Sequence, residues 1–205
     1  MSLPIRWYSY EELRRIAADF LCRHNPVGSI PVPIDTIIEF GFGIDIIPLP
    51  GFLQVHEVDA FLSRDCTSIA IDEGVFNQRS PNRYRFSLAH ELAHVVLHED
   101  IYAQFQFSNV EEWKEEIAAI PDTDYNRLEW QANNFAGLVL VPDNHLKEKF
   151  QDGLRFAAEK GFALDAVPDV ATDYLCKWTS GFFNVSPGVI EVRLDRDKLW
   201  PPTTF

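Results

Sequence analysis

Apolar residues recur with helical spacing at the start of the chain and then switch to short runs separated by turn residues. Residues 10–23 carry one apolar stripe, which predicts an amphipathic helix. Proline and glycine then mark a loop over residues 25–33. The next elements predicted are a short helix over 34–40 closed by Gly41, and short strands over 44–48, 52–56, 60–63 and 68–72.

The segment R-F-S-L-A-H-E-L-A-H-V-V-L-H at residues 85–98 is apolar on nearly every side, which predicts a helix buried in a core. Ser87 is a candidate for its N-terminal cap. Inside the segment, His90, Glu91 and His94 form the pattern H-E-x-x-H. Residues four apart lie on one helix face, so two imidazoles can hold one zinc ion while the glutamate takes a proton from water. Helical context makes a chance match with ordinary core histidines the weaker interpretation.

A second helix is predicted over residues 126–142, and it offers a third ligand. Glu129, Ala132, Asn133 and Ala136 follow helical spacing and share one face, where the small residues allow close approach to the first helix. Catalytic zinc usually has three protein ligands and one open position. Spacing alone leaves two interpretations open for Glu129, a zinc ligand or a surface carboxylate near a helix N-terminus.

The pairing of this segment with E-W-Q-A-N-N-F-A-G-L-V-L-V-P at residues 129–142 resembles the ImmA/IrrE family of metallopeptidases. The resemblance extends over roughly residues 10–200, because the tail also carries an F-x-V-S and R-L pattern. It implies a gluzincin-type Zn²⁺ site with His90, His94 and Glu129 as ligands and Glu91 as catalytic base. The chain departs from the family pattern at Ala93, Gln131 and Val141, where family members often have Gly, Glu and Met. None of these changes removes a predicted ligand.

These patterns predict an α+β fold in two parts. Residues 1–150 are expected to form a zincin-like metallopeptidase core, with a small mixed or antiparallel sheet packed on helices, and residues 151–205 a small helical lobe packed on it. In the lobe, a break at 165–168, a helix over 170–178, a turn at Gly181 and a helix over 186–193 are similar to a helix-turn-helix. The tail has little basic excess, so a lobe that shapes the cleft is favoured over a DNA-binding element. The insert at 101–125, with Phe105, Phe107 and Trp113, has no assigned role.

Three features near the predicted site leave alternatives open. The oxyanion stabiliser is Tyr84, Arg85 or Tyr125, and the sequence does not choose among them. His98 lies one turn beyond His94, where three ligands from one helix would crowd the metal, so it is interpreted as a structural or supporting residue. The strand at 68–72 either borders the cleft, where a peptide could pair with it, or is an interior strand.

Charge and composition limit the classes of partner and the cellular compartment that we expect for this chain. The chain of 205 residues carries 31 acidic against 18 basic side chains, a net charge of −13, which disfavours direct nucleic-acid binding. Three scattered cysteines, no signal peptide and no apolar run long enough for a membrane span indicate a cytoplasmic protein.

The function predicted from motif and resemblance is that of a zinc-dependent endopeptidase. The resemblance implies a protein substrate, a helix-turn-helix transcriptional repressor, whose basic surface would suit an acidic peptidase. The alternative is a non-proteolytic binding module, such as half of a toxin–antitoxin pair or a repressor-sequestering protein. A regulator that binds DNA through its tail is a third interpretation, which the charge weakens. The sequence does not indicate the oligomeric state.

Overall fold

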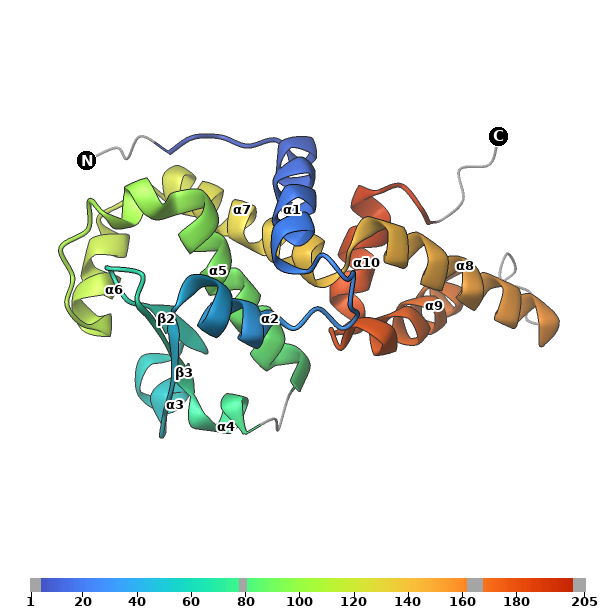
Figure 1. The fold of residues 1–205 in the computed structure, drawn as a ribbon, viewed down its shortest axis with the longest axis horizontal. Helices are drawn as coiled ribbons and strands as arrows, with labels where there is room; N and C mark the ends of the chain where they lie inside the picture. Colours follow the sequence, from blue (N-terminus) through green and yellow to red (C-terminus); the bar gives the residue numbers. More distant parts are fainter. Residues whose placement is uncertain (1–4, 78–80, 162–167, 201–205) are drawn as a thin grey trace.

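The computed structural model describes residues 5–77, 81–161 and 168–200. The chain folds into helices around a small sheet, as the predicted α+β class requires (Figure 1). The sheet has the strand order β1–β3–β2, with β1 (Asp45–Leu49) parallel and β2 (Ala60–Leu62) antiparallel to β3 (Ser68–Asp72). The sheet is therefore mixed. Its register pairs Asp45 with Ser68 and Ala60 with Ile71.

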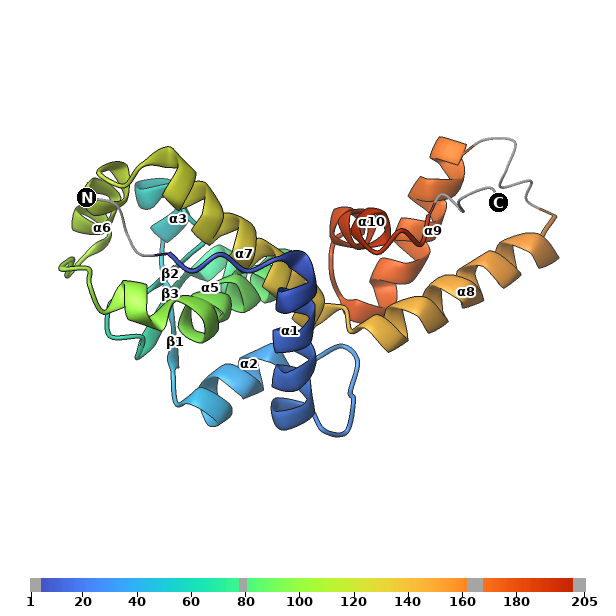
Figure 2. The ribbon, with the colours of Figure 1, turned by 90° about the horizontal axis from the view of Figure 1, so that it is seen from above.

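Two long helices run side by side through the centre of the molecule (Figures 1 and 2). They are α5 (Pro81–Tyr102) and α7 (Asp122–Leu140). Helix α1 (Tyr10–His24) packs on α7, and its N-terminus is fixed by a capping box between Ser9 and Glu12. Fully buried apolar side chains fill the space between the elements: Leu13, Ile38, Ile69, Ile71, Leu88, Leu92 and Phe135.

The remaining elements are short or lie toward the C-terminus. They are α2 (Ile34–Thr36) with a π-helical turn (Ile37–Phe42), α3 (Phe52–His56), α4 (Glu73–Phe76), α6 (Val110–Ala118), α8 (Asp143–Glu159), α9 (Pro168–Phe183) and α10 (Pro187–Arg196). Helices α8, α9 and α10 form a group on the far side of α1 from the sheet (Figure 2). The division at residue 150 stays a prediction, and that residue lies inside α8. Within the described ranges, no helix is both long and apolar enough to span a membrane.

Residues 52–56 form a helix and not the predicted strand. Gly51 adopts a left-handed conformation with φ 70°, which turns the chain before the helix. The Asp72 carboxylate then accepts a hydrogen bond from the Leu53 N–H at 3.0 Å and from the Gly74 N–H at 2.8 Å. One side chain therefore caps the start of α3 and of α4, a long-range contact that local alternation does not reveal.

Three other predicted boundaries differ from the structure, and a fourth falls largely outside the described residues. The helical segment after α1 ends at Gly43, with φ 67°, and not at Gly41. Ser87 lies inside α5, whose first residue is Pro81, so it is not the cap. Gly181 lies inside α9, and the chain turns instead at Asn184, with φ 50°. Of the predicted break at 165–168, residues 165–167 lie outside the described residues.

A buried guanidinium joins the C-terminal helices to the core. Arg193 of α10 is 2% exposed and donates through Nη1 to the carbonyl oxygens of Gly137 and Val141, at the C-terminal end of α7. Through Nη2 it donates to Asp143 at 2.5 Å and to Asp197 at 3.0 Å. The last carbonyls of a helix have no partner within it, so Arg193 satisfies groups that burial would otherwise penalise.

Arg14 of α1 completes this cluster by pairing with the carboxylates of Asp143 and Asp197. Four charged side chains from α1, α8 and the end of α10 thus neutralise one another between the packed helices. The position of α10 against α7 is fixed by these directional contacts as well as by apolar packing.

Replacing the buried guanidinium should destabilise the whole fold. Arg193→Ala leaves two carboxylates with one cation and two helix carbonyls without a donor, so we expect a loss of about 3–5 kcal/mol in the free energy of unfolding. Urea denaturation monitored by circular dichroism measures it. Arg15→Ala, at an exposed site on α1, is the matched control and should change stability by no more than about 0.5 kcal/mol. Equal effects of the two substitutions would show that the cluster does not stabilise the fold.

Candidate metal centre

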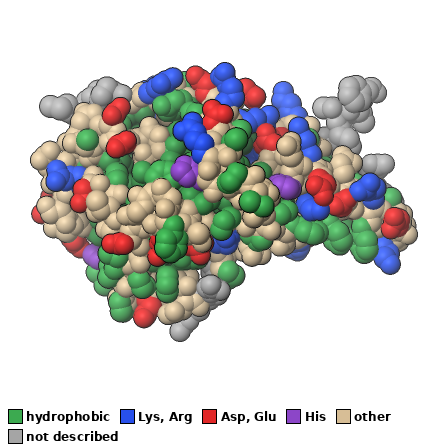
Figure 3. Space-filling model, viewed as in Figure 1, with side chains coloured by type: hydrophobic (Ala, Val, Ile, Leu, Met, Phe, Trp, Pro, Cys, Tyr) green, Lys and Arg blue, Asp and Glu red, His purple; other side chains and the backbone are tan. Residues whose placement is uncertain are grey.

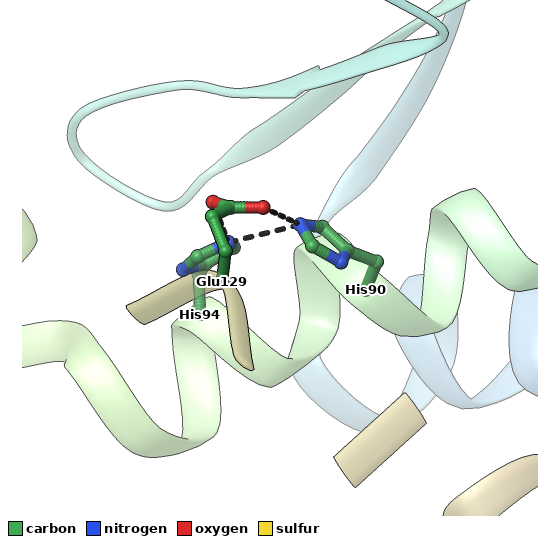
Figure 4. Close-up of side chains that lie close together, drawn as sticks. All are labelled: His90, His94 and Glu129. Atoms are coloured by element: carbon green, nitrogen blue, oxygen red, sulfur yellow. Dashed lines mark hydrogen bonds and ion pairs between the residues drawn. The ribbon is translucent and has the colours of Figure 1, made fainter. Parts of the chain in front are cut away.

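Three predicted ligands converge at the crossing of α5 and α7. His90 and His94 project from successive turns of α5, and Glu129 points at them from α7 (Figure 4). The two Nε2 atoms are 3.2 Å apart. Glu129 Oε2 lies 3.3 Å from His90 Nε2, and Oε1 lies 3.7 Å from His94 Nε2. One donor atom from each side chain falls within 4.8 Å of the others.

The packing of α5 on α7 produces this convergence. Ala132 and Ala136 are fully buried and share a face with Glu129, so they permit a close approach of the two helix axes. Ala89 and Ala93 on α5 are equally buried, at 1% and 0% exposure. Larger side chains at these positions would separate the helices and withdraw the carboxylate from the imidazoles. Glu129 is therefore a member of the cluster and not a solvated surface residue.

The two imidazoles differ in protonation, because burial and neighbouring charges shift their pKa values in opposite directions. His94 is buried, and burial, followed by the neighbouring His90 and His98, lowers its pKa well below the usual value, so its ring is neutral. Burial also acts to lower the pKa of His90, but the hydrogen bond to Glu129 and the charges of Glu91 and Glu129 outweigh burial and raise it. Two imidazole nitrogens and one carboxylate oxygen, facing one another at short range, form the donor set that Zn²⁺ prefers.

Each imidazole has a partner on its other nitrogen. His90 Nδ1 lies 3.2 Å from Asn133 Oδ1, and because an amide oxygen only accepts, the proton sits on Nδ1 and leaves the Nε2 lone pair free. His94 Nδ1 lies 3.0 Å from His98 Nδ1. His98 is 2% exposed, and burial lowers its pKa to about 4, so this ring is neutral and can accept the proton of His94. The structure thus places His98 behind a ligand, outside the His90, His94 and Glu129 cluster.

Gln131 supports this arrangement from α7. It is fully buried, and its side-chain amide donates to the Arg6 carbonyl oxygen at 3.2 Å. Burial lowers the pKa of His98, and the Gln131 side chain opposes that shift. Members of the family that this sequence resembles often have a glutamate at this position. The neutral amide of Gln131 differs from that glutamate because it requires no counter-charge in the core.

Glu91 lies next to the cluster and lines the same cavity of about 370 Å³, termed here the metal-site pocket. Its pKa is raised to about 7, first by burial and then by the charge of Glu129, while His90 and the Leu62 backbone oppose the rise. The donor cluster consists of His90, His94 and Glu129, so the Glu91 carboxylate remains available for proton transfer.

Only one of the three predicted oxyanion stabilisers faces the metal-site pocket. Tyr125 lines it, and burial, followed by the charges of Glu129 and Glu91, raises its pKa, so the phenol keeps its proton. Tyr84 is instead buried against Phe76, at 5.7 Å between ring centroids. Arg85 donates to the Val32 carbonyl oxygen at 2.7 Å.

Sequence reasoning missed Tyr102, whose ring centroid lies 5.4 Å from that of His94 and which also lines the metal-site pocket. It lies two turns after His94, so extending the predicted helix would have indicated it. The backbone of His98 departs from helical geometry, with φ −130° and ψ 17°, and the helix continues beyond it. We attribute the miss to ending the predicted helix near this kink.

The strand that borders the metal-site pocket is β2. Residues 57–61 line the pocket, and β2 lies at the edge of the sheet. Strand β3 lies between β1 and β2, so of the two interpretations left open for residues 68–72, that of an interior strand is correct.

The insert at 101–125 supplies one wall of the metal-site pocket. Trp113 and Ile117 of α6 and Phe105 before it line the pocket. Trp113 packs edge-on against Phe61 of β2, with ring centroids 5.6 Å apart. The insert therefore contacts the edge strand next to the donor cluster.

Removing the residue behind His94 should weaken metal binding without removing a ligand. His98→Ala deletes the partner of His94 Nδ1, and loss of such a partner typically lowers metal affinity 10–100-fold. Titration of added Zn²⁺ against a chromophoric chelator measures the change. His145→Ala, a half-buried histidine remote from the cluster, is the control and should bind as the wild type does. An unchanged Zn²⁺ affinity of His98→Ala would show that His98 does not support metal binding.

A comparison with known protein families supports the interpretation of this region as part of a peptidase. The model of a peptidase family described as the IrrE N-terminal-like domain matches residues 75–195, which include α5, α7 and the donor cluster. No curated protein matches the chain.

Proposed function

We propose that this chain, which belongs to the IrrE N-terminal-like family of peptidases, is a zinc-dependent endopeptidase. The observation that carries the proposal is the convergence of His90, His94 and Glu129 in a pocket that also exposes Glu91. Three ligands leave a fourth position open, as catalytic zinc sites do and structural sites do not.

His90, His94 and Glu129 would hold the zinc ion. When bound, zinc supplies a Lewis acid that lowers the pKa of water and polarises a substrate carbonyl. Glu91 accepts the proton of the attacking water and returns it to the leaving amine, because it lines the pocket beside the ligands without belonging to the donor cluster. Tyr125, which keeps its proton, donates a hydrogen bond to the oxygen on which negative charge develops.

The edge strand supports a polypeptide substrate. Among the described residues, β2 pairs with β3 on one side and with no strand on the other, and its residues line the metal-site pocket. An extended segment can add to a sheet edge through backbone hydrogen bonds, which would place its carbonyl near the donor cluster. The family resemblance and the net charge of −13 favour a basic protein, and we propose a helix-turn-helix repressor as the natural target. Acidic and basic side chains are interspersed over the face in Figure 3.

Loss of the proposed base should separate metal binding from catalysis. Glu91→Gln keeps all three ligands, so we expect one zinc per chain by elemental analysis and a fall of about 10²–10⁴-fold in the cleavage rate of β-casein. Glu159→Gln, an exposed position on α8, should match the wild type in both measurements. A purified Glu91→Gln protein that still cleaves would rule out Glu91 as the base.

Loss of the third ligand should weaken zinc binding as well as cleavage, whereas loss of the base affects cleavage alone. Glu129→Ala removes the only carboxylate of the donor cluster, so we expect zinc to be lost or bound far more weakly, with cleavage lost in parallel. Elemental analysis after dialysis measures it. A wild-type protein that binds zinc and a repressor but cuts neither the repressor nor β-casein would favour the alternative of a non-proteolytic binding module.

A further inference from the structure

We infer that substrate binding extends beyond the metal-site pocket into a second groove against α10, and that this groove holds an extended substrate segment carrying apolar side chains and a carboxylate. The inference rests on the proposed function, since the occupant is the polypeptide to be cut. The groove, termed here the α10 groove, has a volume of about 930 Å³ and lies between the start of α5, the middle of α7 and α10.

The α10 groove and the metal-site pocket form one continuous surface. Asp59, Arg83, Phe86 and Ser87 line both cavities. Asn133 lines the α10 groove and contacts the ligand His90 through Oδ1 at 3.2 Å. A polypeptide whose scissile carbonyl lies at the donor cluster must leave the pocket on both sides. The shared residues make the α10 groove the path on one of them.

Apolar side chains line the groove from three elements. Val189 and Val192 are three residues apart on α10 and therefore share a face, and Val192 is 52% exposed. Phe86 of α5 and Trp130 of α7, both half-buried, line the same groove. Gly188 adds an exposed wall position without a side chain. Apolar groups that enter the groove would cover Val192 and gain the free energy of leaving water.

The charges of the groove favour an anionic group on the occupant. Arg83 is paired with Asp59, so these two charges cancel. Arg196 lies over the ring of Trp130 at 5.2 Å and over that of Tyr10 at 5.6 Å. Among the described residues, no carboxylate forms an ion pair with the Arg196 side chain. The groove thus carries one uncompensated cation in a chain of net charge −13, and a substrate carboxylate can pair with it.

The occupant is a polypeptide segment and not a second copy of this chain or a small molecule. A groove that shares four lining residues with the metal-site pocket is filled by whatever passes through that pocket. The β2 edge that lines the pocket would pair with extended backbone, and the same chain continues into the α10 groove. Affinity for the substrate then depends on residues remote from the scissile bond.

The test compares a long and a short substrate. Sites cut in β-casein by the zinc-loaded wild type are mapped by mass spectrometry. One site with a single acidic residue outside its central part is synthesised as a peptide of about twenty residues and as a core of about six that lacks the acidic residue. Val192→Asp and Arg196→Glu should each raise KM for the long peptide at least tenfold. They should change kcat less than twofold and leave zinc content and core-peptide hydrolysis unchanged.

Val170→Asp is the matched control, because Val170 is 65% exposed on α9 and does not line the groove. It should behave as the wild type on both peptides. A second readout is charge rescue: replacing the acidic residue of the long peptide with Lys should restore binding to Arg196→Glu and weaken binding to the wild type. Urea midpoints equal to the wild type establish that the variants fold.

The outcomes separate the two proposals. Wild-type cleavage with unchanged KM in both Val192→Asp and Arg196→Glu overturns the α10 groove and leaves the peptidase intact. Equal hydrolysis of the core and the long peptide by the wild type overturns it as well. A wild type that binds zinc and cuts neither β-casein nor the peptides overturns the proposed function, and the substrate groove with it.

Discussion

The close packing of α5 against α7 is the constraint on which the donor cluster depends. His90 and His94 are brought together by one helix, but Glu129 reaches them only because buried alanines let the second helix approach. Helix packing distances are set by the side chains at the contact, so Ala132 and Ala136 determine the position of a carboxylate they never touch chemically. Asn133, the partner of His90 Nδ1, also comes from α7, so this single interface positions the donor cluster and orients one of its imidazoles.

Much of the site could be predicted from sequence because its signals are local. The pattern H-E-x-x-H requires only helical spacing, and the apolar character of residues 85–98 supports that helix. Spacing alone does not decide whether Glu129 is a zinc ligand or a surface carboxylate, because its position depends on the packing of two distant segments. The family resemblance indicated it, and the geometry confirms that it joins the histidines.

The errors in the fold come from contacts between residues far apart in sequence. Residues 52–56 are too few for helical and strand periodicity to be distinguished, and the Asp72 carboxylate stabilises the helical form. The insert at 101–125 has no repeat or motif of its own. It forms a wall of the metal-site pocket through the contact of Trp113 with Phe61, which lies far away in the sequence. In the same way, no local pattern indicates that Arg193 is buried and satisfies the end of α7.

β2 is a short strand at the edge of the sheet, and the pairing of its backbone would limit which targets are selected. Three residues of edge strand can pair only with backbone that has no other hydrogen-bond partners. A folded target exposes such backbone only in the fraction of molecules that are locally open, and opening free energies range from near zero to the full stability of the domain. When opening and closing are fast, the rate of cutting follows that fraction, so a segment open once in about 10³ molecules is cut about 10³ times more slowly than an unfolded one. Choice among proteins then depends on the local stability of the target as much as on its sequence.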